Sequence, residues 1–499
     1  MVNSSITFFA QIINIVLKFI LQTIFVKTLG TTYLGINGLF SNVLTILSFA
    51  ELGIGTAITF SLYRPLANDD QETLNIIMAF FKKAYRIIAL VVAVIGLLLL
   101  PLLPFMVKGH VDNLYYIYLL FLSNSVISYF FSYKRSLLLA DQNAYINIIN
   151  QLEFVVLQVV LQVVVLLTLK DFMLYLCIQI VCTILSNVSI SKKVDSLYPF
   201  LNEDSVSPLP TRLRDEIKSN TIGMMGSRIG GIAITGTDNL IISAFIGVHW
   251  VGLYSNYFLI TNSITAVLTQ AVSSVSSSIG NLANSSSKEK TSDVFEKHLF
   301  INFFLTYFST VFLIGLLNPF ISIWLGSNLM LSNSVVMLIV VNFMVNQFRQ
   351  TSLTFISGLG LFAKVGIKSI LEAVINLVIT VVLVREFHMG LSGVFIGTLV
   401  SNLLINVWYE PWIVMKYGIP SMNKFMVVYK YILYNVVTII TMIIVQYMSI
   451  SFFEGGILSF VKIGLFIFII ASTIFVIVFG NSKEFKYSYW LIKTRVLKR

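Results

Sequence analysis

NTIGMMGSRIGGIAITGTDNLIISAFI, residues 220–246, is an apolar segment long enough to cross a lipid bilayer as one helix. Two charged residues, Arg228 and Asp238, interrupt it where hydrocarbon is expected. Facing lipid at a helix centre, each would cost about 2.5–3.5 kcal/mol. At 100° per residue both lie on one broad helix face, and Asn239 lies almost in line with Arg228. The segment therefore predicts the wall of a polar pathway through the membrane, although a buried ion pair that only joins two helices stays open.

The composition predicts an all-α integral membrane protein. Hydrophobic residues make up 57% of the 499 residues, and charged residues only 11%. The excess of Lys and Arg lies in short loops between apolar segments, so no nucleic-acid partner is expected. Cys177 and Cys182 fall within one apolar segment, so we expect neither a disulfide framework nor a metal site. No cofactor is expected.

Fourteen apolar segments are long enough to be transmembrane helices. They span residues 5–26, 37–61, 85–106, 114–133, 147–168, 173–191, 221–246, 252–280, 299–325, 333–356, 367–386, 390–409, 425–447 and 457–479. With this assignment, 25 of the 33 Lys and Arg residues lie in the loops or at the adjoining helix ends of one side, and Lys27, Lys108, Lys170 and Arg385 lie on the other. Because cytoplasmic loops carry the excess of positive charge, both termini are expected to be cytoplasmic.

The sequence repeats itself weakly at an offset near 217. Matched pairs follow one another in the same order: Leu34-Gly35 with Val251-Gly252, Pro104-Phe105 with Pro319-Phe320, and Glu153 with Glu372. Six predicted helices lie in each repeat, an even number, so the two bundles are expected to be related by an axis along the membrane normal. The predicted domains are a bundle at 1–191, a cytoplasmic linker at 192–219, a second bundle at 220–409, and two extra helices with a basic tail at 410–499.

Charged residues inside the predicted helices are the candidate functional residues, because they are costly in lipid. Lys18, Arg228 and Arg349, with Lys134 and Arg135 at the cytoplasmic mouth and Asn239, are candidates for binding an anionic substrate. Glu51, Asp238, Glu153 and Glu372 are candidates for coupling or gating. Two structural alternatives stay open: Lys18 and Glu51 neutralise each other across adjacent helices, and Glu153 and Glu372 each brace a local helix end. No phosphate-binding loop or aqueous catalytic domain is apparent, so no enzyme activity is predicted.

Three pieces of the sequence resemble a known family: YLGINGLFSNVLTILSFAELGIGTAI (33–58), TDNLIISAFIGVHWVGLYSNYFLI (237–260) and the PLAND loop (65–69). They are similar to Wzx-type polysaccharide repeat-unit flippases of the multidrug/oligosaccharidyl-lipid/polysaccharide exporter superfamily. The resemblance implies a MATE-like fold of two six-helix bundles plus two C-terminal helices. Lipid II flippases stay open as an alternative. Drug antiporters of the superfamily, which typically have twelve helices, agree less well with fourteen.

The resemblance also implies a substrate. Such flippases move an oligosaccharide on undecaprenyl diphosphate from the inner to the outer leaflet of the bacterial cell membrane, for capsule, exopolysaccharide or O-antigen assembly. The candidate cations would bind the diphosphate, and the lipid tail would stay in the bilayer. Expected partners are this lipid-linked oligosaccharide, membrane lipids and a polymerase or other assembly proteins. A monomer is expected.

Overall fold

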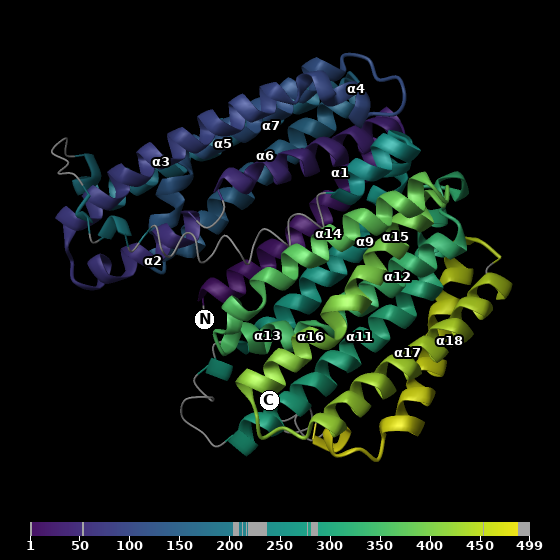
Figure 1. Ribbon diagram of the computed structural model, residues 1–499. Helices are drawn as coiled ribbons and strands as arrows, with labels where there is room; N and C mark the ends of the chain where they lie inside the picture. The colour runs from purple at the N-terminus through teal and green to yellow at the C-terminus, as the bar shows by residue number, and fades with distance from the viewer. Residues whose placement is uncertain are drawn as a thin grey trace. The chain divides into compact units, whose positions relative to one another are not determined.

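The computed structural model describes residues 2–51, 54–202, 209–211, 213–215, 217, 237–276, 278–280, 288–452 and 454–487. These residues form helices and connections without a strand, in two compact units, residues 1–255 and 256–499 (Figure 1). In the described ranges nine helices are long and apolar enough to span a membrane, or ten if the bent pair at 114–130 and 133–140 is one span. The prediction of an all-α, multi-pass membrane protein is confirmed. The count of fourteen stays a prediction, and most of span 221–246, including Arg228, lies outside the described residues.

The first unit packs its helices side by side, with α5 against α3 and α7, and α6 against α1 and α7 (Figure 1). Its elements are α1 (Val2–Leu47), η1 (Ser48–Glu51), α2 (Ile54–Ala67), α3 (Gln71–Leu98), η2 (Leu100–Leu102), α4 (Leu103–Met106), α5 (Leu114–Ala140), α6 (Ala144–Thr168), α7 (Phe172–Leu197), η3 (Pro199–Asn202), η4 (Ile242–Ile246) and the start of α9 (Val248–Ser273).

The sequence predicts a loop between spans 5–26 and 37–61, but the structure has no loop there. Helix α1 covers the first span and the start of the second, and Gly30 interrupts it with φ +81° instead of a loop. Glycine adopts this conformation without the steric penalty that a Cβ brings. The second span is not one regular α-helix either, because η1 is a 3₁₀ segment.

Helices α1 and α9 approach each other at two glycines of the predicted repeat. A Cβ on Gly35 would lie 2.0 Å from the carbonyl oxygen of Val248, and a Cβ on Gly252 would lie 1.8 Å from that of Thr31. Gly252 follows Gly35 by 217 positions, and Val248 follows Thr31 by 217. The contact is therefore reciprocal between positions that the predicted repeat matches. The repeat itself stays a prediction.

We expect Gly252→Ala to separate α1 from α9, because neither backbone can accommodate a methyl group at 1.8 Å. The variant should unfold at a temperature at least several degrees lower than the wild type in detergent. Gly464→Ala on α18 is the matched control, since a Cβ there would meet only Leu316 at 3.8 Å. Equal unfolding temperatures for Gly252→Ala and Gly464→Ala would contradict the close approach.

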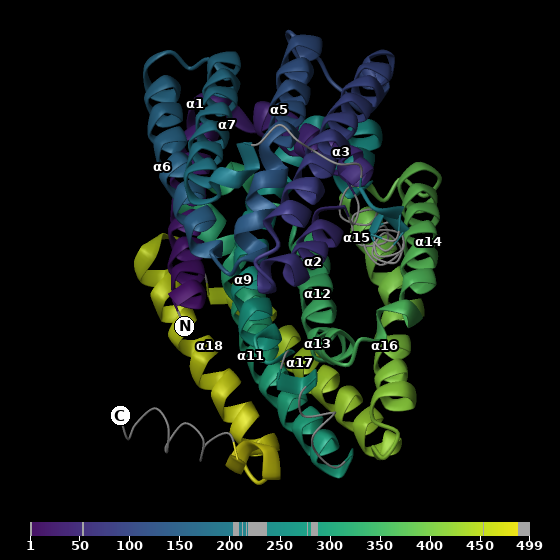
Figure 2. The same ribbon diagram turned by 90° about the vertical axis from the view of Figure 1, so that its left-hand side faces the viewer.

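The second unit packs α11 against α12, α17 and α18, and packs α15 against α12 and α14 (Figure 2). Its elements are the rest of α9, α11 (Lys288–Trp324), η5 (Ser327–Leu329), α12 (Asn333–Phe348), α13 (Gln350–Gly358), η6 (Leu361–Lys364), α14 (Gly366–Arg385), α15 (Gly390–Ser401), η7 (Asn402–Asn406), α16 (Val407–Ile413), η8 (Val414–Gly418), α17 (Lys424–Phe452) and α18 (Gly456–Phe479).

The two C-terminal helices are integral to this unit. Phe303 of α11 stacks on Tyr434 of α17, with ring centroids 4.0 Å apart, and on Phe475 of α18. Lys430 of α17 also forms ion pairs with Glu296 of α11 and with Glu484 beyond α18. Burial alone would raise the pKa of Glu484, but its hydrogen bonds, chiefly the one to Lys430, and the charges of Lys430 and Lys483 together outweigh burial and hold that pKa below its usual value. Helices α17 and α18 are thus held to α11 by aromatic packing and by charge.

Candidate functional site

Two stripes of polar side chains face each other in the second unit. Along α14, Lys368, Glu372, Asn376 and Thr380 recur at every fourth position, and all four are buried. Along the opposite helix, from α15 through η7 to α16, Thr398, Asn402, Asn406 and Glu410 also recur at every fourth position and are buried. Side chains four residues apart share one helix face. The stripes therefore form a continuous polar layer between two helices.

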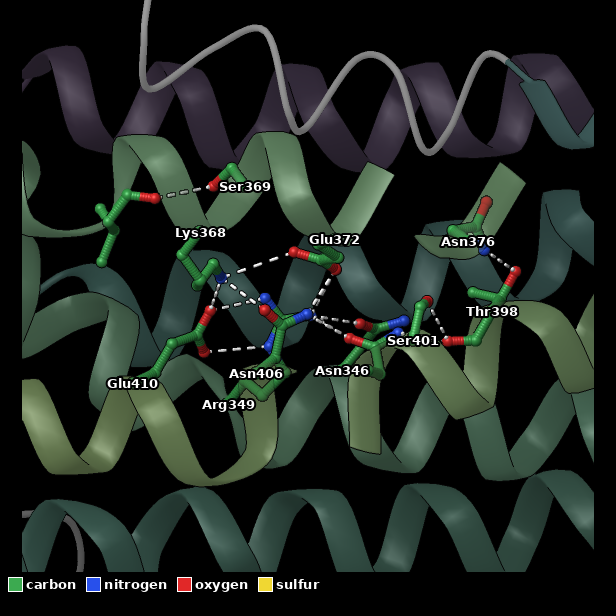
Figure 3. Close-up of polar contacts among 12 residues, drawn as sticks. Asn346, Arg349, Lys368, Ser369, Glu372, Asn376, Thr398, Ser401, Asn406 and Glu410 are labelled. Atoms are coloured by element: carbon green, nitrogen blue, oxygen red, sulfur yellow. Dashed lines mark hydrogen bonds and ion pairs between the residues drawn. The ribbon is translucent and has the colours of Figure 1, made fainter. Parts of the chain in front are cut away.

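Arg349 joins a third helix to this layer, at the junction of α12 and α13 (Figure 3). Its Nε donates to Oε2 of Glu410 at 3.0 Å and its Nη2 to Oε1 at 2.7 Å, a bidentate pair. Its Nη1 donates to the side-chain oxygens of Asn402 at 2.5 Å and Asn346 at 3.1 Å. The guanidinium thus ties the junction of α12 and α13 to the helix that runs from α15 to α16.

Lys368 completes the network. Its Nζ lies 2.6 Å from Oε1 of Glu410, 2.5 Å from Oδ1 of Asn406 and 3.5 Å from Oε2 of Glu372. Glu372 accepts a hydrogen bond from Asn406, and its Oε1 lies 3.8 Å from Arg349. Both cations are therefore within ion-pair distance of both carboxylates, and they lie closer to Glu410 than to Glu372 (Figure 3).

The network is charge-balanced, with two cations and two carboxylates. We call Arg349, Lys368, Glu372 and Glu410 the buried charged network. The side chain of Glu410 is 0% exposed and that of Glu372 is 4% exposed. Removing one partner of such a set leaves an unpaired buried charge, which costs about 3–5 kcal/mol. A proton on Glu372 would likewise leave one positive charge unbalanced. Any change in the charge of the network therefore requires a change in its pairing.

A related contact occurs in the first unit. Lys134 of α5 forms an ion pair with Asp195 of α7 at 2.6 Å and donates to Ser191. Arg349 follows Lys134 by 215 positions, and Glu410 follows Asp195 by 215. Each unit therefore pairs a cation and a carboxylate from corresponding positions of the predicted repeat.

Arg135, the next residue, has neutral partners only. It donates to Asn147, Asn150, Ser186 and Asn187 of α6 and α7. Among the residues that the structure describes, no carboxylate lies within ion-pair distance of it. The predicted candidates Lys134 and Arg135 are thus both held inside the first unit by helices α6 and α7.

The other carboxylate candidates lie in different environments. Glu153 is exposed on α6 and forms no ion pair with a described residue, in contrast to its repeat partner Glu372. Glu51 accepts a hydrogen bond from the hydroxyl of Tyr85 at 2.9 Å. Lys18 is exposed, and no ion pair within the described ranges joins it to Glu51. The alternative in which Lys18 and Glu51 neutralise each other is therefore not seen here.

The candidates near the quoted segment are only partly described. Asp238 lies close enough to Tyr254 for the two to interact electrostatically. Asn239 is buried, and a Cβ on Gly38 of α1 would lie 3.7 Å from its Nδ2. Arg228 lies outside the described residues. The structure therefore places Asn239 beside α1 within the first unit.

The sequence-based prediction missed two members of the network. Lys368 lies at the very start of the predicted span 367–386, where it counts with the loop charge of one side, and Glu410 lies one residue past the predicted span 390–409. In the structure the helical path continues to Gly418, so Glu410 is inside it. The signal that could have found both residues is the period of four shared by Lys368, Glu372 and Asn376, and by Asn402, Asn406 and Glu410. Segment η7 is a π-helical turn, a feature frequent at functional sites.

An apolar groove of about 390 Å³ lies elsewhere in the second unit. Helices α9, α11 and α18 line it with Ile260, Ile264, Phe308, Phe312 and Phe460, among others. It shares no residue with the buried charged network. Its chemistry suits a hydrocarbon chain.

Solved structures of membrane transporters share this fold. An inward-facing multidrug resistance MATE family transporter of the MOP superfamily matches with a TM-score of 0.66 at 17% identity, over 82% of this chain and 94% of that chain. The lipid II flippase MurJ, in an inward closed conformation, matches with a TM-score of 0.68 at 13% identity, over 96% and 99%. A MOP superfamily transporter from Pyrococcus furiosus matches with a TM-score of 0.55 at 17% identity, over 82% and 94%. No protein-family model and no curated protein sequence matches the chain.

These similarities show the fold, and the predicted MATE-like architecture is confirmed to that extent. The matched proteins are transporters and a flippase rather than enzymes. A multi-pass membrane protein with the fold of MOP superfamily transporters is what the sequence and structure together establish.

Proposed function

We propose that this protein is a flippase of the MOP superfamily that moves undecaprenyl-diphosphate-linked oligosaccharide repeat units from the inner to the outer leaflet of the bacterial cell membrane. The observation that carries the proposal is its likeness to a lipid II flippase over 96% of this chain and 99% of that chain. The match to the inward-facing MATE family transporter covers 82% of it. The sequence pieces at 33–58 and 237–260 favour repeat units over lipid II, and hence capsule, exopolysaccharide or O-antigen assembly.

The chemistry of the chain supports an amphiphilic anionic substrate. The diphosphate needs cationic partners, for which the candidates are Lys18, Arg228 and Arg349, with Lys134 and Arg135. Asparagines such as Asn239 suit the hydroxyl-rich sugars, because an amide both donates and accepts hydrogen bonds. The apolar groove of about 390 Å³ suits an isoprenoid chain that stays in the bilayer.

Directional movement requires alternating access, in which ion pairs break on one side as they form on the other. In this proposal the buried charged network and the Lys134–Asp195 pair are the elements that re-pair. Glu51, Asp238, Glu153 and Glu372 are the carboxylates proposed for coupling or gating. Both termini are proposed to be cytoplasmic, and the protein is proposed to act as a monomer beside a polymerase.

A second candidate function is a small-molecule or drug cation antiporter. The inward-facing MATE transporter favours it, with a TM-score of 0.66. Flipping of lipid II or another cell-wall precursor is a third, favoured by the flippase likeness itself. The three differ in what accumulates when the protein is absent.

Deletion of the gene in its own organism is the decisive experiment. We expect lipid-linked oligosaccharides to accumulate on the cytoplasmic face, and the mature polysaccharide to disappear, while lipid II stays at its normal level. Mass spectrometry of extracted lipids distinguishes the two lipids. Accumulation of lipid II would favour the cell-wall alternative. Unchanged lipids together with increased drug sensitivity would favour the antiporter.

A further inference from the structure

Helix α16 has an exposed aromatic stripe on the face away from the buried charged network. Leu404, Trp408, Trp412 and Lys416 follow one another at every fourth position from η7 to η8. Leu404 is 54% exposed, Trp408 57% and Trp412 37%, whereas Glu410 on the same helix is fully buried. The helix thus presents an apolar stripe that ends in a lysine.

Two lysine ammonium groups meet aromatic rings at the end of this stripe. Nζ of Lys416 lies 4.5 Å from the ring centroid of Trp412 and 5.2 Å from that of Tyr417. Lys364 belongs to η6 and Tyr417 to η8. Nζ of Lys364 lies 5.0 Å from the ring centroid of Tyr417. The hydroxyl of Tyr409 donates to the backbone oxygen of Lys364 at 3.2 Å and holds the two segments together. The two cations are therefore positioned by three aromatic residues.

These two cations have no counter-charge among the residues that the structure describes. In the part of the chain that the structure describes, neither Lys364 nor Lys416 forms an ion pair, whereas Lys368, four residues after Lys364, pairs with two carboxylates. Both lysines are exposed. Two exposed cations over the same Tyr417 ring favour an anionic partner from outside the chain.

We propose that Lys364, Lys416, Trp412 and Tyr417, which we call the headgroup surface, bind the phosphate headgroup of an anionic glycerophospholipid. Tryptophan and tyrosine are enriched where a membrane meets water, and lysines there attract anionic lipids. A lipid fits better than a soluble anion because the stripe continues into Trp408 and Leu404, on which acyl chains can lie. The inference is independent of the flippase proposal, since it concerns a resident lipid rather than the transported one.

Lipid titration in nanodiscs tests the proposal. The full chain, with Trp250, Trp324 and Trp490 replaced by Phe, is placed in phosphatidylcholine nanodiscs that contain increasing fractions of brominated phosphatidylglycerol. Bromine quenches the fluorescence of the remaining Trp408 and Trp412 on contact. We expect saturable quenching at a low fraction of phosphatidylglycerol, and a shift of the midpoint by tenfold or more in the K364Q/K416Q variant, because each lysine adds to the attraction.

The variant K82Q/K83Q is the matched control, since it removes two exposed lysines from α3. It should leave the midpoint unchanged, and all variants should unfold at the temperature of their parent. Tyr417→Leu should also weaken binding, because it removes the ring that both lysines contact. Equal quenching by brominated phosphatidylcholine would overturn the proposal. Displacement of the lipid by millimolar inorganic phosphate or diphosphate would overturn it too, because the surface would then be a site for soluble anions.

Discussion

Arg349→Met is expected to lower the free energy of unfolding by about 3–5 kcal/mol, because it leaves Glu410 buried without its bidentate partner. The side chain of Glu410 is 0% exposed, so water cannot replace the guanidinium. Glu410→Gln should cost a similar amount, since it leaves Arg349 and Lys368 facing a neutral group. Both variants should also lose most transport, whichever substrate is carried. Thermal or denaturant unfolding in detergent measures the first effect.

The double variant Arg349→Met/Glu410→Gln distinguishes the contribution of the Arg349–Glu410 ion pair from a general loss of stability at these two positions. It keeps Lys368 and Glu372, so the network is again neutral. We therefore expect its loss of unfolding free energy to be smaller than the sum of the losses in the two single variants. A coupling free energy of about 2–3 kcal/mol is expected. Arg385→Met is the control, because Arg385 is 69% exposed and should change stability by no more than about 0.5 kcal/mol. If Arg349→Met and Arg385→Met unfold alike, the network does not stabilise the fold.

The architecture was largely predictable from the sequence because hydrocarbon imposes one strong rule on each segment. A span must be apolar and about 20 residues long, so most predicted spans overlap the observed helices closely. The errors fall where the rule is weak. Apolarity does not reveal that Gly30 replaces a loop or that η1 interrupts a span. Nor does it set the end of a helix such as α16, which continues past residue 409 through Glu410 because its charge is compensated inside the protein.

The candidate site was predictable only in part, because pairing is a property of three-dimensional packing. A charge in an apolar span predicts that a residue avoids lipid, and this holds for Arg349 and Glu372, which are buried together. It cannot tell which partner compensates the charge. From the sequence alone, Lys368 resembles a loop cation. In the structure, α14 and α16 bring its Nζ to 2.6 Å from Oε1 of Glu410. The predicted repeat did not reveal the environment of a carboxylate either. Glu153 and Glu372 occupy matched positions, yet only Glu372 is buried.

Glu372→Gln is expected to reduce transport at least tenfold, whereas Glu153→Gln should keep most of it. The two carboxylates differ in environment although the repeat matches them. Glu372 lies 3.5 Å from Lys368 and 3.8 Å from Arg349, so its loss leaves the network with one excess positive charge. Glu153 is exposed and compensates no described cation. Export in the deletion strain, measured at matched expression, checks both variants.

A compensating change identifies what Glu372 does. If the loss in Glu372→Gln comes from charge imbalance, then Lys368→Met/Glu372→Gln restores neutrality and should recover transport. If Glu372 instead carries a coupling proton, the double variant stays inactive, and wild-type transport changes between pH 6 and 8 whereas the residual transport of Glu372→Gln does not. If Glu372 only braces α14, the single variant unfolds at a lower temperature but transports normally below it. We expect the first of these outcomes, because Glu372 lies 3.5 Å from Lys368 and 3.8 Å from Arg349, so its negative charge balances theirs in the network.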